Sequence, residues 1–216
     1  MDIAGPAPFA EVRETFLQDH PLEGAHEANS NQDGEQNLER AEQLLGTWWR
    51  VRLSRAEVLG VILPWHLSEG GRLELVPRSG LTVAQAAERI RSGGAEWAEA
   101  NPVCAAKLRL LRHAPFTPVY LSTRPVPHSD YSDLRIREGL IHLDGLHRML
   151  AWELAERLPA EERLDAFIAS DLPIRPATGS GSDAGRRTGR DEHARPATVR
   201  GADTTAPPAP PRKQRA

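Results

Sequence analysis

The side chains best suited to chemistry lie in residues 140–151, where a short strand is expected to turn directly into a helix at Asp144 and Gly145. The first amides of a helix have no partner within the helix, and the helix dipole gives them partial positive charge. Gly145 would let a phosphate approach the backbone, and Arg148 adds a planar cation suited to phosphate oxygens. His147 can donate or accept a hydrogen bond there, and Asp144 can hold a hydroxyl group or a magnesium ion. We therefore expect a nucleotide site bound by Gly145, His147 and Arg148, with Asp144 and His147 as catalytic residues.

Each of these residues also has a simpler interpretation. Helical spacing places His147 on the leucine-rich side of its helix, which would make it a core histidine. Arg148 could pair with a carboxylate of a neighbouring loop, and Asp144 could merely cap the helix. A metal site of His142, Asp144 and His147 is a weaker alternative, because His142 lies on the strand face opposite Leu143 and the other two residues lie around a turn.

Candidates for binding an acceptor substrate lie elsewhere in the chain. Glu23 belongs to a polar segment that could close over a substrate, although a solvated loop is the simpler interpretation. Trp65 and His66 are rarer residues in a loop-like context and could line a pocket, while tryptophan most often supplies core area. We take Glu23, His66 and Glu69 as the substrate candidates. Cys104, on the apolar side of its helix, is expected to be buried and inert.

Periodicity and capping signals predict the elements that must position these residues. Two capping boxes, Ser54 with Glu57 and Thr82 with Gln85, mark two helix starts. Residues 22–37 form a loop by composition. The expected helices are residues 8–19, 38–50, 54–63, 82–93, 101–112 and 146–158, and the expected strands are 72–77, 118–122, 140–143 and 164–169. This order predicts a mixed α/β fold.

The run Asp144-Gly-Leu-His-Arg148, followed two residues later by Ala151, resembles the turn shared by ParB-type proteins, sulfiredoxins and free-serine kinases. The resemblance covers residues 72–170, in which a strand, a helix ending in glycine and the strand Pro-Val-Tyr-Leu occur in the family's order. It implies a ParB/sulfiredoxin-like core over residues 72–172, with a helical elaboration over residues 1–71. It also implies that the turn binds nucleotide phosphates.

Departures from the family pattern narrow the implied activity. Sulfiredoxins carry a reactive cysteine directly before the His-Arg pair, where this chain has Leu146. ParB partition proteins add a helix-turn-helix domain, whereas only residues 173–216 follow here. What is left resembles the serine kinases: a phosphotransferase that uses ATP or another nucleoside triphosphate with Mg²⁺ at Asp144, acting on a small metabolite such as an amino acid in bacterial secondary metabolism. The alternative is a non-catalytic ParB-like regulator whose nucleotide controls partner or nucleic-acid binding.

Charge and composition differ along the chain. Residues 173–216 are rich in Pro, Gly, Arg and Thr and are expected to be a disordered basic tail. Of the 27 Lys and Arg residues, nine lie there, with four of the 30 Asp and Glu residues, so residues 1–172 carry a net charge near −8. DNA binding through this acidic body is therefore not expected, because gripping a duplex requires a basic surface.

The cellular compartment is predicted from features that the sequence lacks. Its single cysteine cannot form an internal disulfide, and neither a leader-like start nor a run of about 20 apolar residues is present. We therefore expect a cytoplasmic protein with no membrane contact. The identity of the acceptor and the oligomeric state are left open by the sequence.

Overall fold

Alternating side chains along the central strands give the sheet two buried faces. In β7 (Leu164–Ser170), Phe167 and Ala169 belong to one hydrophobic core, whereas Ala166 and Ile168 belong to another. Successive side chains of a strand point to opposite faces, so a strand with both sets buried lies between two layers. The fold is the expected mixed α/β arrangement, with helices on both faces of one sheet.

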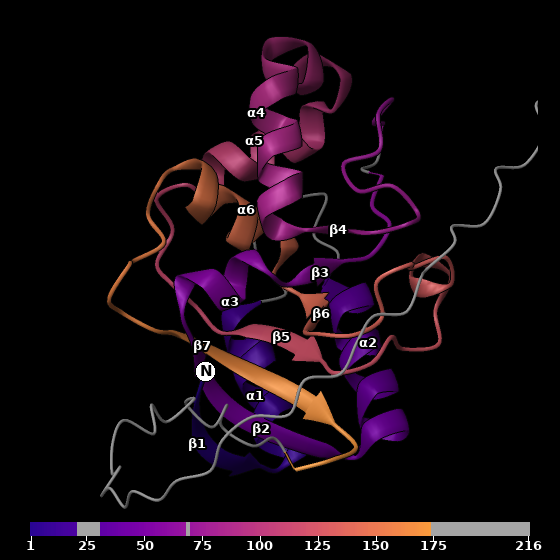
Figure 1. Cartoon of the computed structure of the whole chain (residues 1–216), viewed down its shortest axis with the longest axis vertical. Coiled ribbons are helices and arrows are strands. Elements are labelled where there is room, and N and C mark those ends of the chain that lie inside the picture. The colour runs from indigo at the N-terminus through magenta and orange to yellow at the C-terminus, as the bar shows by residue number, and fades with distance from the viewer. Residues whose placement is uncertain (21–30, 68–69, 174–216) are drawn as a thin grey trace, which may run out of the picture. The chain divides into compact units, whose positions relative to one another are not determined.

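The structure is a computed structural model that describes residues 1–20, 31–67 and 70–173, with only the backbone at residues 31 and 32 (Figure 1). Seven strands form a mixed sheet within these ranges, in the order β1-β2-β7-β5-β6-β3-β4. Besides β7, they are β1 (Asp2–Ala7), β2 (Thr47–Leu53), β3 (Ile62–Leu63), β4 (Leu81–Thr82), β5 (Val119–Ser122) and β6 (Ile141–Asp144). The strand β6 lies inside the sheet, antiparallel to β5 and parallel to β3. The sheet interior therefore holds the strand that ends at Asp144.

Six α-helices cover the two faces in the same ranges. They are α1 (Phe9–Asp19), α2 (Asn31–Leu45), α3 (Arg55–Leu59), α4 (Val83–Ala100), α5 (Pro102–Leu111) and α6 (Leu146–Leu154), with a 3₁₀ helix, η1 (Ser129–Tyr131). Buried residues of α1 and α2 join one core, and those of α3 to α6 join the other. Figure 1 shows α4, α5 and α6 grouped together, with α4 and α5 extending away from the sheet.

Local sequence signals placed several helix starts correctly. Both capping boxes are present: Ser54 with Glu57 begins α3, and Thr82 with Gln85 begins α4. In each, the hydroxyl accepts a hydrogen bond from an amide three residues later while the other side chain accepts one from the cap amide. These starts are determined by short-range hydrogen bonds, which is why a few residues predict them.

The N-terminal third differs most from the prediction. Residues 31–37 are helical rather than a loop, and the helix ends at Leu45 because Gly46 adopts a positive φ of 69°. The chain from Thr47 onward is a strand, although Trp48 continues the helical spacing. The described part of residues 1–71 is thus not a separate helical elaboration: it supplies β1, β2 and β3 to the same sheet as the later strands, so no boundary falls at residue 72.

Other predicted bounds also shift. The helix expected over residues 54–63 ends at Leu59, because Gly60 closes it and the chain then forms β3. Residues 72–77 make only an isolated bridge, between Val76 and His66, instead of a strand. The helix α4 passes Gly93 with a break at Gly94, where φ is 50° and ψ is −131°. The last long helix ends at Leu154 rather than at residue 158.

Two further expectations concern the ends of the chain and the membrane. The tail expected from residue 173 falls outside the described residues beyond Pro173 itself. None of the helices seen in the described ranges has the length and apolar character needed to cross a bilayer.

Candidate functional site

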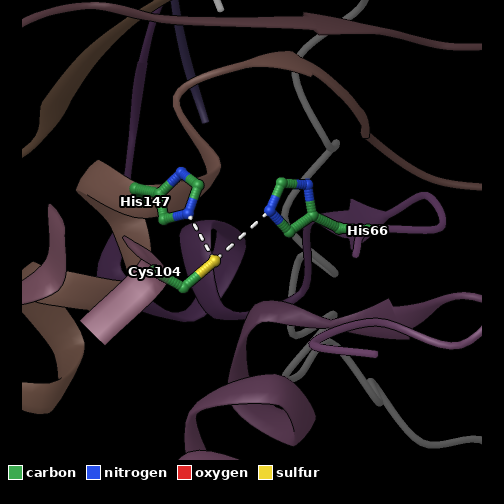
Figure 2. Close-up of side chains that lie close together, drawn as sticks. All are labelled: His66, Cys104 and His147. Carbon is green, nitrogen blue, oxygen red and sulfur yellow. Dashed lines mark hydrogen bonds between the residues drawn. The ribbon is translucent and has the colours of Figure 1, made fainter. Parts of the chain in front are cut away.

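Two histidines and a cysteine, residue types that commonly bind metals, come from distant parts of the sequence and meet on the face covered by α3 to α6. Figure 2 shows His66 and His147 directing their Nε2 atoms at the Sγ of Cys104 from opposite sides. The Sγ to Nε2 distances are 3.5 Å to His66 and 3.2 Å to His147. The three donor atoms all lie within 4.8 Å of one another. We refer to these residues as the His66–Cys104–His147 cluster.

The two sulfur-to-nitrogen separations of the cluster match those of a tetrahedral zinc site. Zn–S bonds of about 2.3 Å and Zn–N bonds of about 2.0–2.1 Å place the sulfur and nitrogen ligands roughly 3.6 Å apart at tetrahedral angles. The observed separations of 3.2 and 3.5 Å lie close to that value. In such a site the two imidazole nitrogens lie roughly 3.3 Å apart. Here they lie within 4.8 Å of each other, so one cation could be held by all three atoms once the two rings adjust.

Each donor is positioned by a different element. His66 is held by its backbone, whose amide donates to Val76 O and whose carbonyl accepts from the Leu75 and Val76 amides. Cys104 lies in the first turn of α5, and His147 lies in the first turn of α6. The α5 and α6 helices pack directly together in the core below. The cluster is therefore tied to fixed backbone on all three sides.

Burial keeps both histidines in the form that binds metals. Loss of solvent lowers the pKa of His66 to about 4, with a further contribution from Lys107. Burial also lowers the pKa of His147 well below its ordinary range, and the neighbouring His66 adds to this effect. At neutral pH both imidazoles are neutral, so each Nε2 can offer a lone pair, as metal coordination requires.

The phosphate site expected at the other side of the same turn is occupied by an internal ion pair. Arg148 Nη2 lies 2.5 Å from Asp144 Oδ2, and Arg148 Nη1 donates to the hydroxyl of Thr117. Arg148 is buried, and Asp144 is largely buried. The guanidinium expected to face a phosphate is thus already neutralised by the carboxylate four residues before it.

Asp144 is a charged member of a polar group on the face covered by α1 and α2. Its Oδ2 also lies 3.2 Å from His20 Nε2 at the end of α1. Burial alone would raise the pKa of Asp144, but Arg148 and His20 outweigh it and hold the pKa of that carboxyl far below its ordinary range. Its role in the structure is therefore that of a buried anion with internal partners, and it does not cap the helix.

The start of α6 is capped from the preceding strand. His142 Nε2 accepts a hydrogen bond of 2.9 Å from the Leu146 amide, the first of the helix. Burial lowers the pKa of His142 to about 4, which keeps this nitrogen free to accept. Gly145 has φ 107°, and a Cβ there would lie 2.9 Å from Val119 Cγ1. Glycine is thus required by the turn and its packing, independently of any ligand.

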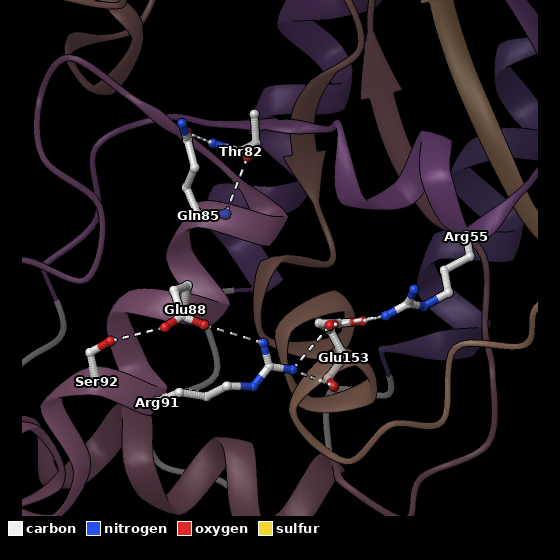
Figure 3. Close-up of polar contacts among 7 residues, drawn as sticks. All are labelled: Arg55, Thr82, Gln85, Glu88, Arg91, Ser92 and Glu153. Atoms are coloured by element: carbon white, nitrogen blue, oxygen red, sulfur yellow. Dashed lines mark hydrogen bonds and ion pairs between the residues drawn. The ribbon is translucent and has the colours of Figure 1, made fainter.

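A buried carboxylate fixes the far end of α6. Figure 3 shows Glu153 between Arg55 of α3 and Arg91 of α4. Its carboxylate lies 2.9 Å from Arg55 Nη2 and 3.0 Å from Arg91 Nη2, and Arg91 also donates to the Glu153 carbonyl. Because the Glu153 side chain is only 8% exposed, these contacts hold α6 firmly against its two neighbours.

The structure separates the predicted site residues into two groups. His66 and His147 share the metal-type cluster, while Asp144 and Arg148 pair with each other on the other side of the turn. His142 belongs to neither group. The prediction that His142, Asp144 and His147 form a metal site is therefore wrong for the described residues. Glu23 and Glu69, the other substrate candidates, lie outside those residues.

Sequence reasoning missed the role of Cys104. The prediction that it is buried is confirmed, since it is 1% exposed, but its sulfur contacts two imidazoles. Its partners lie 38 and 43 residues away, and no local pattern links them. One signal in the sequence could have pointed to this cluster: the only cysteine and two of the eight histidines occur in apolar surroundings.

Fold and site together define a mixed α/β protein with a histidine and cysteine donor cluster at the start of a helix. A family model described as a family of unknown function (DUF6309) matches residues 1–187, and the chain belongs to this family. No curated protein and no solved structure matches the chain. The resemblance to ParB and sulfiredoxin proteins therefore stays a prediction.

Proposed function

We propose that the protein binds one divalent transition-metal ion, for which zinc is the best match, through His66, Cys104 and His147. The observation that carries this proposal is the convergence of three donor atoms within 4.8 Å. Thiolate and imidazole are ligands that zinc prefers, and neutral buried histidines need no proton loss to bind it. Core packing alone does not account for a buried cysteine sulfur between two histidine Nε2 atoms, whereas a role as a metal ligand does.

Three protein ligands are the arrangement of catalytic zinc sites, which keep one position for water or substrate. Although both rings are largely desolvated, His66 and His147 each keep some exposed surface, so a small molecule can approach the metal from their side. The function that follows is metal-assisted chemistry on a small substrate, in which the ion polarises a bound group or activates water. We place this activity in the cytoplasm, where thiols stay reduced and can serve as ligands.

Metal titration tests this proposal directly. Chelator-treated protein should bind one Zn²⁺ per chain in a competition titration, and Co²⁺ should give the thiolate charge-transfer absorption of a sulfur ligand. Cys104→Ser should remove that absorption and weaken zinc binding at least about a hundredfold. The matched control is His113→Ala, which removes an exposed histidine just beyond α5. Equal zinc affinity in Cys104→Ser and the unaltered protein would overturn the proposal.

A nucleotide-dependent phosphotransferase, using ATP and Mg²⁺ on a small metabolite, is the second candidate. The supporting observation is that Arg148 Nη2 lies only 3.4 Å from the position of a Cβ on Gly145, so cation and glycine turn coincide. A phosphate would have to replace Asp144 as the partner of Arg148 and would share His147 with the metal. The nucleotide-controlled regulator, with nucleic acid as a partner, is a weaker form of the same candidate.

Calorimetric titration with ATP, ADP and CTP, each with and without Mg²⁺, distinguishes the two candidates. The nucleotide candidate predicts saturable heat that weakens when zinc occupies His147. The metal candidate predicts that the zinc affinity, calculated from the free zinc left after chelation by the nucleotide phosphates, is the same with and without each nucleotide. Absence of heat with every nucleotide removes the second candidate, and a gel shift in a salt series tests the nucleic-acid partner separately.

A further inference from the structure

A hollow lies between α4, α5 and α6, apart from both groups of the turn. Its volume is about 340 Å³. Aliphatic and aromatic side chains line the hollow together with three arginines. The lining residues are Ile90, Arg91, Gly94, Trp97, Ala98, Ala105, Leu108, Arg109, Arg112, Ala151, Leu154 and Ala155. We call it the three-helix groove.

Small residues create the groove. Alanines occupy four lining positions on three different helices, namely Ala98, Ala105, Ala151 and Ala155. Gly94 adds a break in α4 at the same place. Helices that approach through larger side chains would fill such a space, because protein interiors are packed to a density that leaves few voids. The groove thus results from these small residues and not from loose packing at the ends of the helices.

The charges on the groove are all positive. Arg91 is engaged by Glu153 and, at 3.9 Å, by Glu88. Arg109 and Arg112 are exposed, and neither has a carboxylate within ion-pair distance in the described part of the chain. An apolar floor beside two uncommitted guanidinium groups calls for a ligand with a hydrocarbon part and a negative end.

We propose that the three-helix groove binds a straight-chain fatty carboxylate of medium length. The hydrocarbon chain lies on the floor formed by the alanines and Leu108, where removal of its CH₂ groups from water favours binding. The carboxylate lies between Arg109 and Arg112, whose planar groups bond both oxygens. The volume matches a single small molecule, since pockets for such ligands begin at about 300 Å³. This binding is independent of the proposed metal site.

Calorimetry with the full chain and decanoate, below the concentration at which it forms micelles, tests the inference. Decanoate should bind with one site per chain. Decanol, which keeps the chain without the charge, and butyrate, which keeps the charge on a short chain, should each bind at least tenfold more weakly. Arg109→Gln combined with Arg112→Gln should weaken decanoate at least tenfold. Arg89→Gln, which removes an exposed arginine of α4 outside the groove, should leave binding unchanged.

A second test of the inference fills the groove with a larger side chain. Ala98→Leu should weaken decanoate at least tenfold with an unchanged circular dichroism spectrum, and Ala155→Leu serves if the first variant does not fold. Equal binding of decanol and decanoate, or affinities within twofold in the double arginine variant, would overturn the inference. So would binding of an acidic amphipathic peptide with no binding of decanoate, because the partner would then be a protein.

Discussion

The two sides of the turn at Gly145 hold the same kinds of residue in opposite situations. On the side of α1 and α2, Asp144 and Arg148 satisfy each other, and His20 and Thr117 complete their hydrogen bonds. On the side of α4 to α6, His66, Cys104 and His147 direct three donor atoms at one point. Charged groups that already satisfy each other need no ligand, and removing one of them leaves the other buried without a partner. Converging lone pairs, by contrast, are the arrangement that a metal ion requires. Our proposals rest on this difference: a structural role for the first side and metal binding for the second.

The largest effect is expected from Arg148→Ala. Removal of this arginine leaves the Asp144 carboxylate buried without its main partner, which should lower the free energy of unfolding by about 3 to 5 kcal/mol. Urea unfolding measures this loss. The control is Arg124→Ala, whose pair with Asp171 is exposed and should be worth less than about 1 kcal/mol. A loss as small in Arg148→Ala as in the control would show that the Asp144 side of the turn is not structural.

Zinc should stabilise the protein only through the His66–Cys104–His147 cluster, on the other side of the turn at Gly145. At a free zinc concentration 100 times the dissociation constant, the free energy of unfolding should rise by about 2.7 kcal/mol. Thermal unfolding with zinc and with a chelator measures this gain. It should vanish in Cys104→Ser and persist in Arg148→Met, which retains packing volume beside Asp144. A zinc gain that survives Cys104→Ser would mean that the ion binds elsewhere.

Glu153→Gln should have a smaller effect, because the amide can still accept one hydrogen bond from Arg55 or Arg91. Loss of the charge from a buried acceptor of two arginines is expected to cost about 1.5 to 2 kcal/mol in urea unfolding. Glu88→Gln, which removes an exposed partner of Arg91, is the control and should change stability by less than about 1 kcal/mol. Equal effects in the two variants would show that Glu153 does not hold α6.

The smallest effect should be a pH dependence traced to Asp144. Its folded pKa lies below the unfolded value of about 4, so its contribution to stability is complete above that pH and is lost as the pH falls through the folded pKa. The difference in unfolding free energy between the unaltered protein and Asp144→Asn should therefore be constant above about pH 5 and shrink below about pH 4. Zinc-free protein should be used, so that loss of bound zinc at low pH does not contribute.

Asp171→Asn is the control for this measurement. Its carboxylate is 40% exposed, and its pair with Arg124 is expected to contribute little at any pH. A difference for Asp144→Asn that stays flat between pH 7 and pH 3 would contradict the assignment of Asp144 as a buried, permanently charged partner of Arg148.

Sequence by itself determined the features that depend on neighbours in the chain. Both capping boxes, the mixed α/β class and the strand that turns into a helix at Gly145 follow from hydrogen bonds and periodicities within a few residues. The N-terminal strands were not predictable in this way, because β1 and β2 owe their state to pairing with each other and with β7. Trp48 fits the helical spacing equally well, and only the sheet decides its conformation.

Tertiary structure alone decided which residues of the turn pair with each other and which join the donor cluster. Asp144 and Arg148 are four residues apart, so their pairing was possible from the sequence, but its burial depends on α1, α2 and the sheet around it. The His66–Cys104–His147 cluster joins three elements whose proximity follows from packing over long separations. Long-range packing is set by the sum of many weak contacts, which no short stretch of sequence encodes.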